Sequence, residues 1–574
     1  MTAKMALRIF LRQIKQSKQR KLSTSAVVLQ KSDDTNFIIK SPLPDIVIRE
    51  QRFIDRLWLD SASFTNHVAI ECAETNKAYT YSQLQKHMST FATSLHKRFG
   101  LKQGDVVAAM LPNCPEFPVV AFGTIQAGCV LTTFNPIYKE YEISHHILTT
   151  EPKLVVTIPE CYDTVVKSLI NAKRNAKIIL IDNPNTKMPE AATRFTEIAE
   201  NGDVDHTLLD KIETKLDNTA FIPFSSGTTG LPKGVEISYK NILSALEIMQ
   251  NKHICFPNLT KGDHQDILPC ILPFFHIYGL VVPLMGHLAL GCKLITMSRF
   301  SATLYLDILK KQDVTLLYVV PPIAILLGKH PDVTKEHFRK VQHIVSGAAP
   351  LSATDVELIL EKGNESLEFH QGFGTTETTA MGTTVFIGAK VKNYSSNGKP
   401  TSNAELKFID PITGKNVPVG QSGELCIRSP TIMKGYHKNE KATKESMTED
   451  NFFKTGDVGH YDVDDGLFIT DRIKDLIKVK GMQVAPAELE SILRSHPSVQ
   501  DAAVIGVPHV YFGEVPKAVI IMKKGQNASP QELQSYVAEK VAAYKKIEQV
   551  VFVEDIPKTA SGKILRSELK KMYA

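Results

Sequence analysis

Short apolar segments alternate with helical segments along most of this 574-residue chain, over residues 38–470. The apolar segments, such as residues 106–111 and 316–320, have the length and composition of buried strands. The segments between them, for example residues 81–99, place apolar side chains at the spacing of a helix. Strands that alternate with helices predict an α/β fold, in which sheets are flanked by helices.

The pattern changes at residues 471–474, Asp-Arg-Ile-Lys, where a charged junction precedes a shorter alternation. Strand-like residues 499–507 and 517–522 and helical residues 487–495 and 530–541 fit a compact α+β unit. Because a chain of this length exceeds what one hydrophobic core supports, we expect at least two domains. The alternative interpretation of the junction is a solvated turn.

A composition with 43% hydrophobic and 22% charged residues is that of an ordinary globular protein. The net charge of the whole chain is +6, but residues 1–22 contain seven basic and no acidic side chains. The rest of the chain is therefore near neutral. A near-neutral body excludes the basic surface of a nucleic-acid-binding protein.

The eight cysteines form no CxxC pair, so their spacing suggests neither a zinc site nor a disulfide framework. The longest apolar run, residues 277–290, is too short and too interrupted to span a membrane.

Residues 224–234, Phe-Ser-Ser-Gly-Thr-Thr-Gly-Leu-Pro-Lys-Gly, connect two strand-like segments. Glycines let a backbone approach a ligand closely, and successive N–H groups can then converge on an anion. Four hydroxyls and the Lys233 ammonium add further donors. The spacing differs from the P-loop of nucleotide hydrolases, because Gly234 stands where that motif needs Ser or Thr. We predict a loop that wraps phosphate; an ordinary solvated loop is the alternative.

This loop resembles the signature loop of the adenylate-forming superfamily, which contains acyl-CoA synthetases, 4-coumarate–CoA ligases, luciferases and peptide-synthetase adenylation domains. Similar blocks follow in the family's order from about residue 60 to Arg566, and they are most similar to the 4-coumarate–CoA ligase and luciferase-like branch. The resemblance implies an acid–CoA ligase that uses ATP, Mg²⁺ and coenzyme A. The carboxylate of such an acid attacks the α-phosphate of ATP, and the acyl-adenylate then passes its acyl group to the CoA thiol.

The resemblance places the nucleotide on several blocks. In the loop, the β- and γ-phosphates would be held by Ser225, Ser226, Gly227, Thr228, Thr229, Gly230 and Lys233. Further nucleotide contacts would come from Gly347, Ala348, Ala349, Gln371, Gly372, Phe373, Gly374, Thr376, Asp457 and Arg472. Of these, Thr376 would meet the α-phosphate, and Asp457 would bind ribose because a carboxylate accepts from both hydroxyls. A surface ion pair is the alternative for Asp457 and Arg472.

Glu377 is the carboxylate that the resemblance assigns to Mg²⁺, a cation that prefers oxygen ligands. Thr376 and Glu377 also suit the start of a helix, and both interpretations can hold together. The block departs from the usual pattern at Phe373 and Thr375, where tyrosine and methionine are common. An aromatic face at Phe373 still permits stacking on adenine.

His276 lies in the apolar and aromatic residues 273–279 and resembles the family histidine that positions the acyl carboxylate. Without the other motifs, a buried core histidine would be the better interpretation. Tyr278 is a candidate for the acyl pocket. Near the C-terminus, Lys563 resembles the lysine that bridges the carboxylate and the α-phosphate, the alternative being an exposed basic tail.

Residues 478–484 resemble a second face of the small domain, which serves thioester formation. Lys478 and Gln483 would contact the adenylate there, while Lys480 and Gly481 would bind CoA. Two faces for one active site imply a mobile C-terminal domain that rotates about Lys474 between the half-reactions. The family thus predicts a large domain over residues 38–470, a hinge over 471–474 and a small domain over 475–574.

The sequence motifs are also compatible with three other functions. They are a luciferase-like oxygenase, a ligase that loads a carrier protein, and a non-catalytic nucleotide-binding or scaffold protein. The segments expected around the acyl group, residues 276–280, 320–325 and 372–375, are apolar enough for either a fatty chain or an aromatic ring. From the family resemblance, the partners predicted for the chain are a small carboxylic acid, ATP and CoA.

Residues 1–22 have the composition of a mitochondrial transit peptide, because basic and apolar residues alternate and no acid precedes Asp33. Residues 20–23, Arg-Lys-Leu-Ser, resemble a mitochondrial processing site with cleavage after Leu22, which leaves residues 23–37 as a linker. The last residues, Lys-Met-Tyr-Ala, are not a Ser-Lys-Leu peroxisomal signal. We expect the mitochondrial matrix; a cytoplasmic protein with a basic membrane-surface helix is the alternative.

This expectation predicts that residues 1–35 fused to a fluorescent reporter direct it into mitochondria of a eukaryotic cell. The measurement is the location of the fluorescence relative to a mitochondrial dye. A diffuse cytosolic signal would contradict the prediction.

Overall fold

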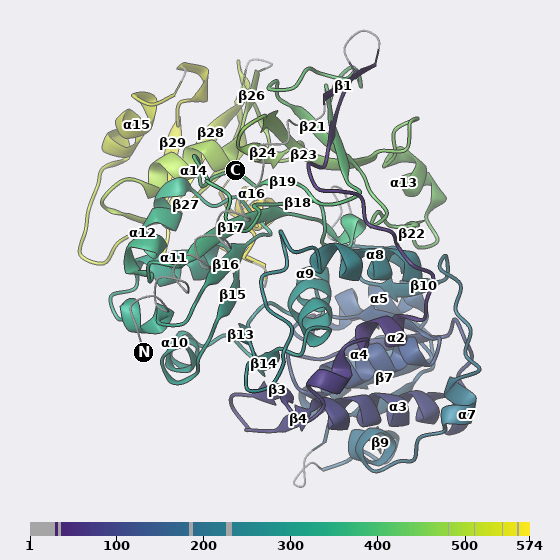
Figure 1. Ribbon diagram of the computed structural model, residues 1–574. Coiled ribbons are helices and arrows are strands. Elements are labelled where there is room, and N and C mark those ends of the chain that lie inside the picture. The colour runs from purple at the N-terminus through teal and green to yellow at the C-terminus, as the bar shows by residue number, and fades with distance from the viewer. Residues whose placement is uncertain are drawn as a thin grey trace, which may run out of the picture.

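The computed structural model describes residues 29–32, 36–182, 187–225, 232–479, 482–509, 511–541, 543–559 and 562–573. Figure 1 shows most of the purple and blue N-terminal part at the lower right and the yellow C-terminal part at the upper left; the first purple strand lies at the top. The transit peptide predicted for residues 1–22 lies outside the described residues, as do Ser226, Gly227, Thr228, Thr229, Gly230, Lys480 and Gly481.

The first sheet is mainly parallel and covered on both faces. Its strand order is β11-β12-β10-β6-β5-β7-β8-β9, with β22 against β12. The bounds are β5 Val106–Met110, β6 Val130–Thr133, β7 Leu154–Thr157, β8 Lys177–Leu180, β9 Ala192–Arg194, β10 Thr219–Ile222, β11 Phe224–Ser225, β12 Lys233–Ser238 and β22 Gly435–Tyr436. The helices that accompany it are α2 Phe53–Leu57, α3 Tyr81–Lys97, α4 Glu116–Gln126, α5 Glu140–Thr150, α6 Tyr162–Asn171, α7 His206–Leu209 and α8 Tyr239–Met249.

Alternation along the strands explains why this sheet is buried on both sides. In β5, Val107 and Ala109 belong to the core under α3, α4 and α8, whereas Ala108 and Met110 belong to the core under α5 and α6. Successive side chains of a strand point to opposite faces, so a strand covered twice is apolar throughout. The predicted α/β fold is therefore confirmed at the level of its central sheet.

Two smaller sheets also belong to the large domain. One has the order β13-β14-β3-β4, with bounds β3 Val68–Cys72, β4 Ala78–Thr80, β13 Ile267–Cys270 and β14 Lys293–Thr296. The other has the order β15-β16-β17-β18-β19, with bounds β15 Leu316–Val319, β16 His343–Ser346, β17 Glu368–Phe373, β18 Thr383–Thr384 and β19 Lys399–Pro400. The helix α10 Ala302–Lys311 leads from β14 into β15, and α11 Pro321–Lys329 and α12 Ala353–Lys362 connect β15 to β16 and β16 to β17.

An antiparallel sheet closes the large domain. Its order is β1-β2-β20-β21-β23-β24, with bounds β1 Leu29–Ser32, β2 Asn36–Lys40, β20 Glu405–Ile409, β21 Gly423–Arg428, β23 Phe453–Asp462 and β24 Gly466–Arg472. The helix α13, Glu440–Glu445, precedes β23. Because β23 and β24 pair antiparallel, Asp457 lies opposite Arg472 at the edge that leads into the C-terminal domain.

The C-terminal domain has its own core. Its sheet runs β26-β25-β28-β27 with β29 on β28, and its bounds are β25 Ile477–Val479, β26 Met482–Val484, β27 Val499–His509, β28 Gly513–Met522 and β29 Gln549–Phe552. The helices are α14 Pro486–Arg494, α15 Pro530–Ala538 and α16 Arg566–Tyr573. Leu489, Leu493 and Leu533 pack with Val504 and Ile520 of the sheet. A small α+β domain with a separate core was the expectation for this part of the chain, and it is confirmed.

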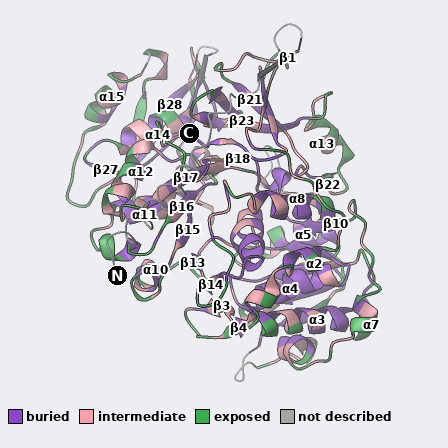
Figure 2. Cartoon of the chain, in the orientation of Figure 1, coloured by how far each residue is buried: buried purple, intermediate pink, exposed green. Residues whose placement is uncertain are grey.

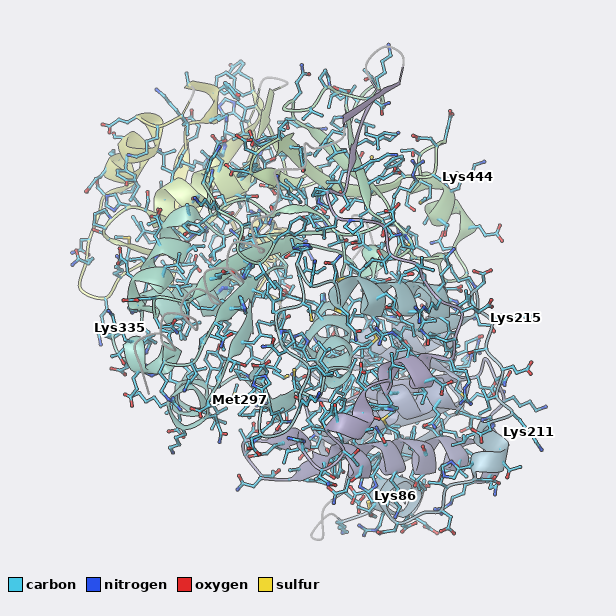
Figure 3. All side chains as sticks on the ribbon, viewed as in Figure 1. Lys86, Lys211, Lys215, Met297, Lys335 and Lys444 are labelled. Carbon is cyan, nitrogen blue, oxygen red and sulfur yellow. The ribbon has the colours of Figure 1, made fainter. Side chains whose placement is uncertain are left out.

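Burial follows the layers of the molecule. Buried residues fill the sheets and the inner helix faces, whereas exposed residues lie on the outer helix faces and connecting loops (Figure 2). The labelled lysines Lys86, Lys211, Lys215, Lys335 and Lys444 extend outward, while Met297 is buried (Figure 3). In the part of the chain that the structure describes, no helix is both long and apolar enough for a membrane span.

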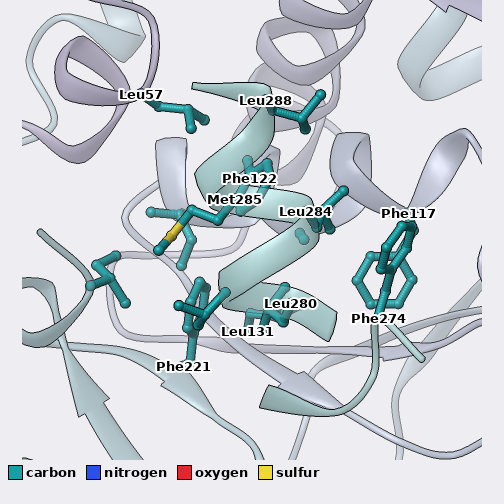
Figure 4. Packing of buried hydrophobic residues seen from close by; sticks show 14 of the residues in the cluster. Leu57, Phe117, Phe122, Leu131, Phe221, Phe274, Leu280, Leu284, Met285 and Leu288 are labelled. Carbon is teal, nitrogen blue, oxygen red and sulfur yellow. The ribbon is translucent and has the colours of Figure 1, made fainter. Parts of the chain in front are cut away.

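A π-helical turn at the centre of the large domain positions the site. This turn, η4 Leu280–Gly286, follows the short helix α9 Ile277–Gly279, and its Leu280, Leu284 and Met285 are fully buried. They lie near Phe122, Leu131 and Phe221, beside the edge-to-face pair Phe117 and Phe274 (Figure 4). A rigid apolar anchor on this side fixes His276 and Tyr278 immediately before the turn.

Candidate active site

A cavity of about 510 Å³ lies where the large domain meets the C-terminal domain. It brings together side chains that the sequence places far apart. Of the predicted site residues, those that line it are Ser225, Lys233, His276, Tyr278, Gly347, Ala348, Gly372, Phe373, Gly374, Thr376, Glu377, Arg472 and Lys563. Ligands of α/β proteins bind outside the carboxyl ends of parallel strands, and Gly347 and Gly372 stand at those ends of β16 and β17.

Close packing explains two of the predicted glycines. A Cβ atom on Gly374 would lie 2.3 Å from the carbonyl oxygen of Ala380, so no side chain fits there. At Gly372 a Cβ atom would come within 3.0 Å of the Thr383 carbonyl oxygen. These glycines keep the backbone of the Gln-Gly-Phe-Gly block pressed against the next strand, which leaves its other side open to the cavity.

Glu377 lies in a small polar cluster that the sequence did not reveal. Its Oε1 accepts a hydrogen bond from the Tyr436 hydroxyl at 3.0 Å, and its backbone oxygen accepts from Met433 N at 2.8 Å. The Lys233 ammonium lies over the Tyr436 ring, 4.8 Å from its centroid. A phosphate-binding ammonium and a metal-binding carboxylate would therefore share one aromatic support. Among the described residues, Oε2 of Glu377 has no hydrogen-bond partner, so the residues present fit Mg²⁺.

Asp457 and Arg472 form an ion pair at the boundary of the two domains. Arg472 Nε lies 2.9 Å from Asp457 Oδ1, and Asp457 is buried. Its Oδ2 accepts no hydrogen bond from the described part of the protein. Burial raises the pKa of Asp457, and Arg472 and then Lys563 oppose that rise. Asp457 itself does not line the cavity, but the adjacent Gly456 does. A buried acceptor without a partner suits a ligand hydroxyl, such as those of ribose.

Lys563 enters the cavity from the C-terminal domain. Its backbone is held by Thr559, whose Oγ1 accepts from Lys563 N at 3.0 Å and whose N–H donates to Lys563 O at 2.8 Å. Gly562 precedes it with a φ of +78°, and a Cβ atom there would lie 2.8 Å from Pro322 of α11. Burial lowers the pKa of Lys563 to about 8, with Arg472 adding to the effect and Asp457 opposing it. Its environment thus differs from that of the exposed lysines.

His276 is a neutral hydrogen-bond donor in this setting. Burial lowers its pKa to about 4, and Lys563 contributes to the same shift. Its Nδ1 accepts a hydrogen bond from Tyr278 N at 3.2 Å, so the proton of the neutral ring resides on Nε2. That N–H can donate to a carboxylate oxygen, as the predicted role requires.

The apolar end of the cavity contains few polar groups. Its walls include Met249, Ile254, Phe256, Val282 and Leu290. The Tyr318 hydroxyl lies 3.0 Å from His287 Nε2, and His287 Nδ1 lies 2.7 Å from Val282 O. The Tyr278 hydroxyl is buried and has no hydrogen-bond partner within the described ranges.

Some predicted site residues lie away from the cavity. Gln371 is buried, and its amide donates to the carbonyl oxygens of Leu351 and Tyr394. Ala349 and Lys474 are not part of the lining either. The exposed Lys478 pairs with Gln483 across β25 and β26, and its N–H donates to Glu514. The structure thus presents the Lys563 face of the C-terminal domain to the cavity and not the Lys478 face.

Tyr436 is the main cavity residue that sequence reasoning missed. The pairing of β22 with β12 brings it beside Val235, next to the phosphate loop. Asn241 supports this arrangement, because its amide donates to Pro430 O and Ile432 O, both at 2.8 Å. No local sequence pattern predicts a strand of two residues, so Tyr436 can be identified only once the pairing of β22 with β12 is known.

Comparison with known proteins agrees with this geometry. Residues 58–437 match the AMP-binding enzyme family, and residues 488–563 match the C-terminal domain of AMP-binding enzymes. The chain is 35% identical to 4-coumarate–CoA ligase 1 of Arabidopsis thaliana, over 96% of this chain and 98% of that protein. It is 36% identical to 4-coumarate–CoA ligase CCL1 of Humulus lupulus, over 94% and 98%.

A solved structure also has this fold. ATP-bound MatB from Rhodopseudomonas palustris superposes with a TM-score of 0.81 at 28% identity, over 91% of this chain and 98% of that one. The two domains and their order are thus those of a known class of enzyme. The chain therefore belongs to the AMP-binding enzymes of the adenylate-forming superfamily, in the branch that contains the 4-coumarate–CoA ligases.

Proposed function

We propose that this protein activates a hydroxylated aromatic acid, which it attaches first to AMP and then to coenzyme A. The class of reaction follows from the family: the protein is an ATP-dependent, AMP-forming acid–CoA ligase that passes through an acyl-adenylate. The observation that carries the choice of acid is the buried Tyr278 hydroxyl, which lacks a partner among the residues described.

A buried hydroxyl without a hydrogen bond costs free energy, because it has lost its contact with water. A fatty chain in the cavity would leave Tyr278 in that state, whereas a ring hydroxyl would satisfy it. Tyr318 offers a second polar contact: His287 Nδ1–H donates to Val282 O, so the Tyr318 hydroxyl donates to His287 Nε2 and its oxygen stays free to accept. The relatives named for 4-coumarate, a hydroxylated aromatic acid, support the same choice.

The groups around the reacting centre have complementary tasks in this proposal. The Nε2–H of His276 orients the acid's carboxylate, while the Lys563 ammonium stabilises negative charge that develops at the α-phosphate. Lys233 contacts the departing phosphates, and Asp457 binds the ribose. Glu377 would hold Mg²⁺, which when bound neutralises charge on the phosphates.

We further propose that the C-terminal domain reorients between the two half-reactions. Lys563 lies in the cavity, which suits adenylate formation, whereas Lys478 is exposed outside it. Lys474 lies in the turn that follows β24 and links the two domains. Rotation there would bring the Lys478 face towards the adenylate for attack by the CoA thiol.

Replacement of Tyr278 by Phe should lower kcat/KM for hydroxycinnamic acids by about tenfold, because one buried hydrogen bond is lost. The measurement is CoA consumption with 4-coumarate, cinnamate and short, medium and long fatty acids. Cinnamate, which lacks the hydroxyl, serves as the control and should be turned over equally well by both proteins.

The same screen tests the choice of acid. The wild-type protein should prefer 4-coumarate over cinnamate and over every fatty acid. A preference for a fatty acid, together with no effect of Tyr278→Phe on 4-coumarate, would refute the aromatic substrate but leave the ligase class intact.

Lys563→Ala and Lys478→Ala should affect opposite half-reactions. Loss of the Lys563 ammonium should reduce ATP–pyrophosphate exchange by about 100-fold or more while sparing thioester formation from supplied acyl-adenylate. Lys478→Ala should do the reverse. Each variant is the control for the other, and equal losses in both steps would contradict the assignment of two faces.

Adenylation should decline as the pH rises above about 8. Because burial lowers the pKa of Lys563 to about 8, the ammonium is present below that pH and is lost above it. An ordinary lysine would keep its charge until about pH 10. The measurement is the pH profile of kcat/KM for ATP, which reports the free enzyme.

Lys563→Arg provides the comparison for this profile. Guanidinium stays charged throughout the range, so the alkaline decline should move upward even if the maximal rate falls. An alkaline limb at the same pH in both proteins would show that another group is responsible.

A further inference from the structure

Two histidines and a glutamate meet on the sheet below the cavity, outside the active site. His343 begins β16, and Glu368 and His370 lie on the neighbouring parallel strand β17. His343 pairs directly with Glu368 in the register of the sheet, and His370 follows two residues later. Residues two apart in a strand share a face, so the three side chains converge on one side of the sheet.

The separations of their ligand atoms match those of a metal site. His343 Nδ1 lies 3.2 Å from His370 Nε2 and 3.8 Å from Glu368 Oε2, and His370 Nε2 lies 3.5 Å from that same oxygen. A point about 2.0 Å from all three atoms exists at these separations, and this is the usual length of bonds from zinc to imidazole nitrogen and carboxylate oxygen.

The protonation of His370 is set by its second nitrogen. Nδ1 lies 3.2 Å from the Val385 carbonyl oxygen, which can only accept, so Nδ1 carries the proton. In the neutral ring Nε2 then presents a lone pair to the cluster. An imidazole that donates its other N–H to a carbonyl is the usual support of a metal-binding histidine.

Other contacts hold the remaining parts in place. Gly388 N donates to Glu368 Oε2 at 3.1 Å, which orients the carboxylate. The Phe256 ring lies 4.6 Å from the His370 ring and 5.3 Å from the His343 ring, centroid to centroid. His370 is buried, whereas the Glu368 side chain is 39% exposed, so solvent reaches the cluster from the Glu368 side.

We propose that His343, Glu368 and His370 bind a zinc ion, with water as the fourth ligand on the exposed side. Two imidazoles, one carboxylate and an open position make a ligand set that zinc uses in proteins. This site is distinct from the Mg²⁺ position at Glu377 and does not depend on the proposed function. His343 and Glu368 lie at the amino ends of β16 and β17, and Phe256, which packs against both histidine rings, also lines the cavity.

Zinc titration of the full-length, untagged protein tests the proposal. The protein is stripped with EDTA, dialysed, and titrated with Zn²⁺ against a chromophoric chelator, without ATP or CoA. The wild type should bind a single zinc ion per chain in competition with the chelator. Glu368→Gln should weaken that binding by at least about tenfold, because changing a metal ligand should cost at least as much affinity as changing a residue that hydrogen-bonds to a ligand.

Glu368→Gln is the preferred variant because the partly exposed amide can still accept from Gly388 N, so the fold should be retained. His330→Gln is the matched control: His330 lies near Asp332, at 4.0 Å, but outside the cluster. This control should bind zinc as the wild type does. Far-UV circular dichroism and Tm without metal verify that all three proteins fold alike.

Two further readouts decide the outcome. Zinc should raise the Tm of the wild type in a concentration-dependent manner but not that of Glu368→Gln. Co²⁺ in place of zinc should give the intense visible absorption of a four-coordinate site in the wild type alone. Equal zinc affinity in the wild type and Glu368→Gln, or no zinc bound by the wild type, would refute the site and leave the cluster as a histidine–histidine hydrogen bond.

Discussion

The burial of the Lys563 ammonium is the constraint on which the active site depends. Removing an ammonium from water is costly, and here the carboxylates of Asp457 and Asp475 only partly compensate that cost. Lys563 belongs to the C-terminal domain, and the cavity belongs mostly to the large domain. The two domains pack closely at the contact between Gly562 and Pro322, where a side chain on Gly562 would not fit. A phosphate in the cavity would supply the missing negative charge and so favour this arrangement.

Elsewhere around the cavity, groups of opposite charge lie close together. Arg472 accompanies Asp457, and Lys233 shares the Tyr436 ring with Glu377. Such an arrangement suits a ligand that carries several negative charges and arrives with a cation. His276 is kept neutral by burial, which lets it donate to a carboxylate without adding a positive charge beside Lys563.

The sequence predicted the parts of the site that depend on local backbone form. Gly374 illustrates this, since the Ala380 carbonyl leaves no room for a side chain. It could not predict what depends on pairing between distant strands. Tyr436 reaches Glu377 only through β22 and β12, and His343 meets Glu368 only through the register of β16 and β17. Gln371 differs from the prediction for the same reason, because its amide donates to the carbonyl oxygens of Leu351 and Tyr394, whereas its neighbours Gly372 and Phe373 line the cavity.

The strands β16 and β17 link the proposed zinc site to the nucleotide site. Their amino ends carry His343 and Glu368, and their carboxyl ends lead to Gly347 and Gly372. At about 3.3 Å per residue, the four steps from His343 to Gly347 span only about 13 Å. Two hydrogen-bonded strands of this length move together, so an ion that fixed one end would restrict the other. The backbone at Gly347 and Gly372, which lines the cavity, would then be positioned by a cation bound outside it.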